Sequence, residues 1–250
     1  MKVQSTYLLK IFPDSDALNK ATAEFIITIA NKAVNEKGRF VISLSGGKTP
    51  ENLYSILSKS PFREKIPWQK TDVYWGDERC VPLNDERNNA HRAKTLLLEK
   101  VDIPVANIHP VPVNLAPETA AKEYENEIKN YFLPEISRFD LIILGLGENG
   151  HTASLFPDTK ILEEQTEGVR DVYVKEEDMF RVTMTAPLIN QAHHILFLVS
   201  GEQKAEILEK VLSSSGQTIK YPAQLIRPSH GDVTWFVDQA AATSLNEKGE

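Results

Sequence analysis

LIILGLGENGHTASLFP, residues 141–157, joins a short apolar run to a turn that holds three glycines. The run at 141–144 predicts a buried strand, and the glycines between residues 145 and 150 end it abruptly. Glycine permits a positive φ and lets the backbone approach a ligand closely. His151 follows directly, so the sequence predicts an imidazole at a strand end, placed for proton transfer near neutral pH.

A second predicted strand ends in a similar way at SGGKTP, residues 45–50. We expect Thr49 to cap a helix whose first residue is Pro50. The free N–H groups of such a helix start bind phosphate together with the helix dipole, and Lys48 adds a positive charge. The spacing is not that of a Walker A loop, and a strand-to-helix turn that merely needs glycines is the alternative. The candidate phosphate-binding residues here are Gly46, Gly47, Lys48 and Thr49.

Outward from these two turns, strand and helix patterns alternate along the whole chain. This alternation predicts an α/β fold with a largely parallel central sheet flanked by helices. We find no repeat or linker, and expect a single domain over residues 1–250 with a polar, frayed tail from about residue 243. The stretches 76–89 and 158–180 are predicted as loops, apart from a strand near 172–174. The other expected strands are 7–12, 40–44, 72–75, 108–113, 139–144, 181–185, 195–199 and 233–237, and the expected helices 15–38, 50–57, 90–98, 117–131, 202–212 and 238–242.

Composition excludes several classes of protein. The formal net charge of −7 and the lack of a basic cluster argue against nucleic acid as a partner. The sequence contains no run of 18 apolar residues, so it predicts no transmembrane helix. Its first residues match the pattern of a signal peptide poorly. A single cysteine, Cys80, allows no internal disulfide and fits a reducing cytosol. We therefore expect a cytoplasmic protein, a monomer or small homo-oligomer, that binds neither nucleic acid nor membrane.

Cofactor and metal signals are weak. Residues 145–150 match G-x-G-x-x-G, but the acidic residue expected about 20 positions later should end a strand. Glu164 and Glu167 instead lie in a polar, loop-like stretch, and Pro157 leaves little room for the helix that the motif requires. Histidine and cysteine spacings do not match a zinc site. We therefore expect no nicotinamide, no other cofactor and no metal.

Four further charged residues are candidates because several strand ends should converge on one cleft. Asp77 and Arg79 follow a predicted strand and suit sugar hydroxyls and an oxyanion or phosphate, respectively. Arg181 begins a β-rich run, and Lys204 lies early in a helix. The alternative for each is a solvated surface charge, and for His151 a satisfied core histidine. Cys80 has no evident base partner and is read as a small buried residue.

Five segments, in this order, resemble the glucosamine-6-phosphate deaminase/6-phosphogluconolactonase family. They are SLSGGKTP (43–50), YWGDERCVP (74–82), LGLGENGHTASLFP (144–157), RVTMTAPLIN (181–190) and FLVSGEQKAEIL (197–208). The resemblance implies a Rossmann-like fold, no metal, and a phosphorylated sugar lactone as the small-molecule substrate. The reaction it implies is hydrolysis of 6-phospho-D-glucono-1,5-lactone in the oxidative pentose phosphate pathway.

The resemblance also separates the two branches of the family. Deaminases carry a Glu-Pro pair after the histidine turn, where this chain has Phe156 and Pro157. The deaminase Asp-Glu-Tyr is here DER at 77–79, the lactonase form. Both differences favour a lactonase. A deaminase-like sugar-phosphate isomerase and a non-catalytic sugar-phosphate-binding protein are the alternatives.

One departure concerns the general base. The family usually has Asp-Gly-His where this chain has Asn149, Gly150 and His151. Asn149 can orient the imidazole by hydrogen bonding but cannot supply a charge. Glu148, Asp77 or a backbone carbonyl are alternative partners, and a weaker base is another possibility that the sequence leaves open.

The mechanistic hypothesis assigns a role to each candidate. His151 removes a proton from the water that attacks the lactone carbonyl. Asn149 stands beside it in the sequence where the family usually has an aspartate, and can orient the imidazole. Backbone amides of a glycine turn or a nearby arginine stabilise the oxyanion. Asp77 contacts sugar hydroxyls, and Arg79 and Arg181 share phosphate or oxyanion contacts. The phosphate is assigned to Gly46, Gly47, Lys48, Thr49 and Lys204.

Overall fold

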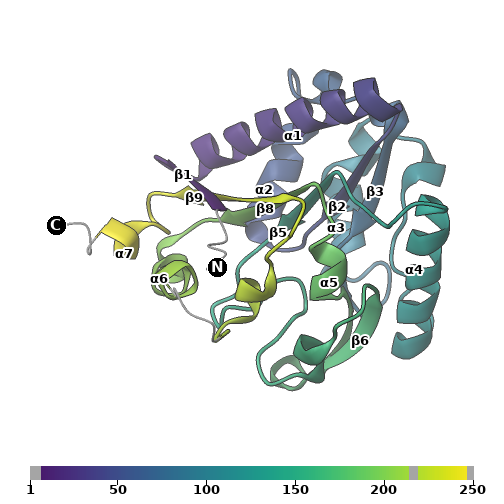
Figure 1. Cartoon of the computed structure of the whole chain (residues 1–250). Coiled ribbons are helices and arrows are strands. Elements are labelled where there is room, and N and C mark those ends of the chain that lie inside the picture. The colour runs from purple at the N-terminus through teal and green to yellow at the C-terminus, as the bar shows by residue number, and fades with distance from the viewer. Residues whose placement is uncertain (1–6, 214–218, 247–250) are drawn as a thin grey trace.

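The computed structural model describes residues 7–213 and 219–246. Its centre is a six-stranded sheet in which every neighbouring pair of strands runs parallel, as Figure 1 shows. The predicted α/β class with a largely parallel sheet is confirmed. In spatial order the strands are β1 (Tyr7–Phe12), β9 (Asp232–Asp238), β8 (His194–Val199), β5 (Leu141–Leu144), β2 (Phe40–Leu44) and β3 (Thr71–Trp75).

Helices cover both faces of the sheet because its central strands are apolar on both sides. Alternate residues of β5 belong to different cores: Leu141 and Ile143 pack on one face, Ile142 and Leu144 on the other. The first face is covered by α1 (Ser15–Lys37), α2 (Lys48–Leu57) and α3 (Asn89–Leu96). The second face is covered by α4 (Pro117–Phe132), α5 (Ala186–Ile189) and α6 (Ala205–Ser213).

Local sequence explains where the long helices begin and end. Asp14 caps α1 by accepting a hydrogen bond from the amide of Ala17 at 2.8 Å, which is typically worth about 1 kcal/mol. Gly38 closes the same helix in the left-handed region, at φ 80°. Pro117 stands in the first turn of α4, where its missing N–H costs nothing. These boundaries agree with the sequence-based expectations.

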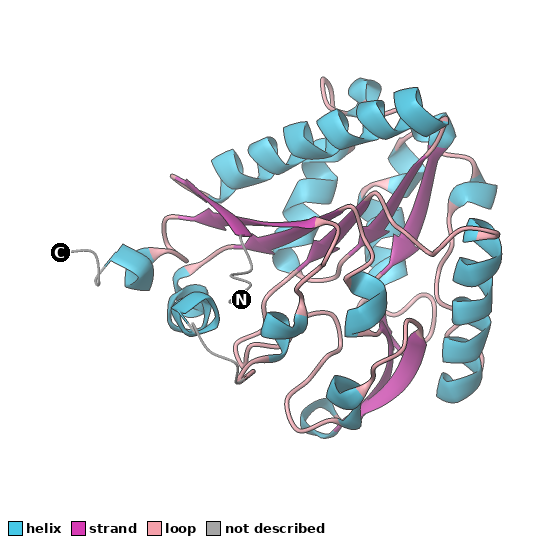
Figure 2. Cartoon of the chain, viewed as in Figure 1, coloured by secondary structure: helices cyan, strands magenta, loops and turns pink. Residues whose placement is uncertain are grey.

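A second sheet, of three antiparallel strands, lies apart from the first, as Figure 2 shows. Its strands are, in spatial order, β4 (Asp77–Arg79), β7 (Met179–Met184) and β6 (Val169–Val174). The sequence-based expectation of a loop at 76–89 is therefore wrong for residues 77–79, and that for 158–180 is wrong for residues 169–171 and 179–180, because β6 begins before the predicted strand at 172–174 and β7 begins at Met179. Strand β4 has three residues, all charged, and it exists through pairing with a strand 100 residues away, which no local pattern reveals.

Three other expectations are also wrong. Helix α2 begins at Lys48 with Gly47 as its N-cap, and no side chain caps it, so Thr49 is not the cap. Residues 108–113 form one isolated bridge, between Ile108 and Val73, and no strand. Residues 238–242 are not a helix, because Asp238 ends β9 and its carboxylate accepts the amide of Ala241 in a turn.

Shorter elements complete the chain. Helix α7 covers Thr243–Asn246, and residues 247–250 of the expected tail lie outside the described residues. The helix expected at 202–212 begins as a 3-10 turn and continues as α6. Within residues 7–213 and 219–246, no helix is long and apolar enough to cross a membrane. The 3-10 helices are Arg63–Lys65, Trp68–Lys70, Leu98–Lys100, Val105–Asn107, Lys160–Glu163, Lys175–Glu177, Glu202–Lys204 and Pro222–Leu225.

The strand order creates a crevice between β2 and β5. These strands are neighbours, but the chain leaves them in opposite directions along the sheet. After β2 it continues to β3, at the edge of the sheet beside β2, whereas after β5 it passes through the second sheet to β8, which lies beside β5 on its other side. In open parallel sheets, ligands bind outside the carboxyl ends of strands where the connections diverge in this way. Both glycine turns singled out by the sequence follow these two strands. The fold therefore brings them together.

Candidate active site

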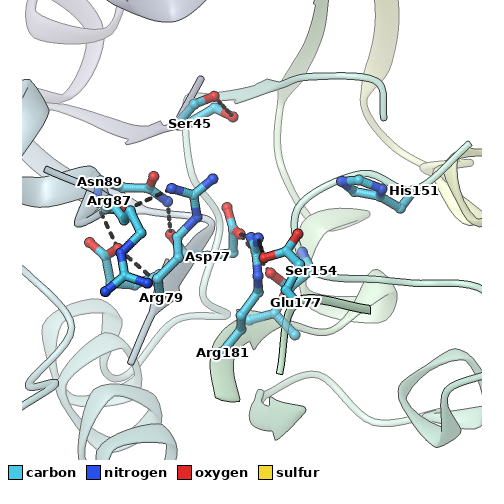
Figure 3. A network of polar contacts seen from close by, with 12 residues as sticks. Ser45, Asp77, Arg79, Arg87, Asn89, His151, Ser154, Glu177 and Arg181 are labelled. Carbon is cyan, nitrogen blue, oxygen red and sulfur yellow. Dashed lines mark hydrogen bonds and ion pairs between the residues drawn. The ribbon is translucent and has the colours of Figure 1, made fainter. Parts of the chain in front are cut away.

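A cleft of about 510 Å³ lies at this divergence point, a volume suited to a small ligand. It brings together most of the predicted site residues, namely Gly46, Gly47, Asp77, Arg79, Asn149, His151, Arg181 and Lys204. Lys48 and Thr49 do not line it; they occupy the first two positions of α2, next to Gly47. Figure 3 shows Asp77, Ser154 and Arg181 between Arg79 and His151.

The imidazole of His151 is oriented by Asn149. The side-chain oxygen of Asn149 lies 2.6 Å from Nδ1 of His151 and also accepts that residue's backbone N–H at 3.2 Å. An amide oxygen only accepts hydrogen bonds, so this contact assigns the proton to Nδ1 and leaves the lone pair on Nε2. Of the partners that the sequence left open, the structure selects Asn149.

Packing holds the same ring from two sides. It stacks on Phe156 with centroids 4.0 Å apart and an interplanar angle of 24°. A Cβ atom built on Gly147 would stand 2.1 Å from Cε1 and Nδ1 of the ring, so only glycine fits at this position. The glycine turn therefore makes room for the imidazole, and Phe156 packs against it.

The surroundings of His151 keep it neutral. Burial lowers its pKa to about 4, and the positive charges of Arg181 and Lys204 act in the same direction. The carboxylates of Asp77 and Glu177 oppose this shift without cancelling it. At neutral pH the ring is therefore uncharged and able to accept a proton at Nε2.

Two arginines stand opposite each other in the second sheet. Arg79 and Arg181 are directly paired across β4 and β7, an arrangement of like charges that is unfavourable by itself. Arg181 is compensated by Asp77, whose Oδ2 lies 3.5 Å from Nη1, and by Glu177, which accepts from Nη2. The buried Nε atoms of both arginines have no partner in the part of the chain that the structure describes. A bound anion would complete this group.

Asp77 is held more tightly than the sequence suggests. Its Oδ2 accepts a hydrogen bond from the Ser154 hydroxyl at 2.6 Å in addition to facing Arg181. Its backbone carbonyl accepts the side-chain amide of Asn89 at 2.9 Å. Contact with sugar hydroxyls stays a prediction for this residue, since one of its oxygens is already engaged.

Glu78 anchors the cleft wall from behind. Because neighbours in a strand point to opposite faces, its side chain leaves the cleft and meets the start of α3. It accepts the amides of Asn89 at 2.7 Å, Ala90 at 2.8 Å and Arg79 at 2.8 Å. Burial raises the pKa of this carboxyl to about 7, and the three amides act against that rise. This link ties β4 to α3 and keeps Arg79 in place.

The start of α2 and Lys204 form a further region with features that suit an anion. Gly47 has φ 105° and no side chain caps the helix, so its first amides have no partner within it. Lys204 closes a 3-10 turn after β8, where Gly201 takes φ 99°. Burial lowers the pKa of Lys204, and Glu148 opposes that change. These features suit an anionic group such as phosphate.

Sequence reasoning missed several cleft residues. Ser45 and Asn89 line the cleft; Asn88 caps α3 and Asn89 is its first residue, and an asparagine at this position is a readable helix-start signal. Glu176 and Glu177 also line it, but they lie on the turn between β6 and β7, within the stretch for which the sequence predicts a loop. Cys80 is half-buried, and burial raises the pKa of its thiol to about 11. The described residues contain no cluster of three or more His, Cys, Asp or Glu suited to a metal.

Known proteins resemble this chain over most of its length. A family model described as glucosamine-6-phosphate isomerases/6-phosphogluconolactonase matches residues 13–235. A 6-phosphogluconolactonase of Synechocystis sp. is 43% identical over 225 residues, which cover 88% of this chain and 90% of that protein. One from Haemophilus influenzae is 37% identical over 236 residues, covering 94% and 98%. The solved 6-phosphogluconolactonase of Trypanosoma brucei aligns with a TM-score of 0.84 at 26% identity, over 97% of this chain and 100% of that one. The family match includes every segment that lines the cleft.

Proposed function

The chain belongs to the glucosamine-6-phosphate isomerase/6-phosphogluconolactonase family, and we propose that it hydrolyses 6-phospho-D-glucono-1,5-lactone to 6-phospho-D-gluconate. This is the lactonase step of the oxidative pentose phosphate pathway. The observation that carries the proposal is a neutral His151 whose Nε2 has no hydrogen-bond partner among the described residues, in a cleft that also holds several cationic groups. Such a site suits attack by water on an ester whose substrate is anionic.

His151 acts as the general base. Its Nε2 takes a proton from water as the water oxygen forms a bond to the lactone carbonyl carbon, giving a tetrahedral oxyanion. When that intermediate collapses, the bond to the ring oxygen breaks and the imidazolium returns the proton to the departing oxygen; the carboxylic acid formed then loses its proton to the solvent and becomes the carboxylate. A positioned base of this kind contributes roughly 10²–10⁴-fold. Asn149 keeps the reactive nitrogen directed at the water by holding Nδ1.

Arg181 is the cation assigned to the oxyanion. Its guanidinium carbon lies 5.3 Å from the centre of the Phe156 ring, and the same ring stacks on His151. Loss of one donor to an oxyanion typically costs about 10²–10³ in rate. Arg79, its cross-strand neighbour, is assigned a shared contact with the oxyanion or the phosphate.

The phosphate anchors the other end of the substrate. We assign it to Lys204 and to the start of α2, through Gly46, Gly47, Lys48 and Thr49. Binding a charged group remote from the ester positions the reacting carbon without taking part in the chemistry. Asp77 is left with the sugar hydroxyls.

The deaminase alternative lacks one group that it needs. Phe156 stands where a deaminase carries the glutamate that assists ring opening, and its ring is engaged against His151. Release of ammonia from glucosamine 6-phosphate would reveal that activity. A non-catalytic binding protein would hold 6-phosphogluconate without turnover.

The setting of the protein is also proposed. Its net charge of −7 and single cysteine support a cytoplasmic protein without a nucleic-acid partner. We propose one domain over residues 1–250, working as a monomer or a small homo-oligomer. Size-exclusion chromatography with light scattering measures the last point directly.

Proton release from freshly generated 6-phosphoglucono-1,5-lactone tests the function, with wild type and His151→Ala compared against the spontaneous background. Fast release by wild type alone supports both the activity and the base. Equal acceleration by both proteins keeps the activity and removes His151 as base. Release at the background rate by both refutes the lactonase, and ammonia release from glucosamine 6-phosphate then becomes the assay.

A further inference from the structure

Two of the four acidic residues that line the proposed substrate cleft lie on one turn. Glu176 and Glu177 belong to the 3-10 turn Lys175–Glu177 that joins β6 to β7. A phosphorylated substrate gains nothing from carboxylates in its cleft, so their presence needs an explanation. Only one of them is engaged: Glu177 accepts a hydrogen bond from Nη2 of Arg181, whereas Glu176 has no ion pair among the described residues.

Arg181 stands at the reacting end of the cleft. Its guanidinium carbon is 5.3 Å from the centre of the Phe156 ring, against which His151 stacks. Its side chain is only 6% exposed, and its Nε has no partner among the described residues. An anionic group generated at the carbon attacked by water would therefore find this arginine first.

The two acids that face Arg181 are held differently. Asp77 is buried, accepts the Ser154 hydroxyl at 2.6 Å and stands 3.5 Å from the guanidinium. Glu177 is 38% exposed, lies on a short turn and makes no other hydrogen bond in the described part of the chain. Asp77 is thus fixed beside Arg181 by a second hydrogen bond, whereas Glu177 has no other hydrogen bond among the described residues to hold it when a ligand takes its place. Figure 3 shows Glu177 beside Arg181, with His151 further along the cleft.

Hydrolysis changes the charge of the ligand group that lies near Arg181. The substrate presents an uncharged ester at this end, and the reaction converts it into a carboxylate. A carboxylate is also what Glu177 already offers to the arginine, so product and side chain have the same chemistry and the same target. Two carboxylates that share one guanidinium repel each other.

We propose that Glu177 competes with the product's carboxylate for Arg181 and thereby weakens product binding. The proposal rests on the proposed lactonase function, since it takes 6-phosphogluconate as the product. Glu177 does not touch the reacting atoms; it sets affinity by pairing with Arg181 whenever the cleft lacks a carboxylate. Product release is favoured because the side chain returns to the arginine as the ligand leaves.

The experiment compares two ligands and two variants of the full chain. Calorimetric titration at pH 7 gives the Kd of 6-phosphogluconate and of glucitol 6-phosphate, which has a hydroxymethyl group in place of the carboxylate. Glu177→Gln removes the competing charge with little change of shape. Glu176→Gln, one residue away on the same turn, is the matched control for a general change in cleft charge. Thermal unfolding confirms that both variants fold.

Glu177→Gln is expected to bind 6-phosphogluconate about 3–5-fold more tightly, the size associated with a partly exposed ion pair, and glucitol 6-phosphate as wild type does. Glu176→Gln is expected to bind both ligands as wild type does. Equal tightening of both ligands, no change, or weaker binding by Glu177→Gln would each overturn the proposal. If Glu177→Gln tightens binding of 6-phosphogluconate alone but the wild type does not accelerate lactone hydrolysis, the proposed function is refuted and the competition at Arg181 is not. If the wild type binds neither ligand, both the function and the competition are refuted.

Discussion

The side-chain oxygen of Asn149 lies 2.6 Å from Nδ1 of His151, so a neutral amide occupies the place from which a carboxylate would stabilise the imidazolium. Two properties of a general base are thereby separated. Orientation and tautomer are retained, because an amide oxygen accepts Nδ1–H as well as a carboxylate does. The negative charge that would raise the pKa of the imidazole is absent, and burial lowers that pKa to about 4.

The pH profile follows from this low pKa. A base with a pKa of about 4 stays deprotonated well below neutrality, so kcat/KM is expected to be level from about pH 5.5 to 7 and to fall only toward pH 4. The folded protein also binds fewer protons at His151 than the unfolded chain between about pH 4 and 6.5. Stability from this group is therefore present above about pH 6.5 and lost as pH falls through 4. Initial rates across buffers measure the profile, and an acid limb near pH 6.5 would show that the ring is not buried as described.

Asn149→Asp tests the same relationship from the other side. A carboxylate beside Nδ1 favours the imidazolium, so the acid limb of kcat/KM is expected to move upward by about one to three pH units, the usual effect of an opposite charge at this distance. Asn149→Leu, which keeps the volume but removes the acceptor, is expected to lower kcat and leave the fold intact. An acid limb that stays in place in Asn149→Asp would separate Asn149 from the titration of His151.

Gly147→Ala is expected to displace the imidazole. The new Cβ would stand 2.1 Å from two atoms of a ring that also stacks on Phe156, with centroids 4.0 Å apart. A shift of about 1 Å in a catalytic group costs roughly 10² in rate, so kcat should fall by about that factor while thermal unfolding changes little. Gly145→Ala is the comparison, because a Cβ there meets nothing within 4 Å. Similar losses in both variants would mean that backbone freedom, and not the ring, explains the effect.

The parts of the site that the sequence predicts are those built from local signals. The turns at 45–50 and 145–150 follow strongly apolar strands, and a parallel sheet brings the carboxyl ends of such strands to one edge. Glu177 could not be predicted, because its contact with Arg181 requires β6 and β7 to pair and their hairpin has an irregular, acidic sequence. Thr49 failed as a cap because Gly47, at φ 105°, is the N-cap and the helix begins at Lys48, two residues earlier than predicted. Local patterns thus predict the centre of the sheet and the base, and long-range pairing decides the charges around them.

The two lysines assigned to the phosphate differ in their position relative to the cleft. Lys204 lines the cleft and its pKa is lowered by burial, whereas Lys48 is exposed at the first position of α2 and does not line it. Lys204→Ala is therefore expected to lower kcat/KM for the phosphorylated lactone by roughly 10–10²-fold, since a charge-assisted contact is typically worth about 1.5–3 kcal/mol. Lys48→Ala is expected to cost less than about threefold, as exposed charges usually do.

Unphosphorylated gluconolactone is the control substrate for both variants. Because it lacks the anchored group, Lys204→Ala should hydrolyse it as wild type does, which assigns the loss to phosphate binding and not to the chemistry. An equal loss on both substrates would move Lys204 to the reacting end of the cleft, where it already influences the pKa of His151. A larger loss from Lys48→Ala than from Lys204→Ala would instead show that the start of α2 moves onto the ligand and that the exposed lysine turns inward when phosphate binds.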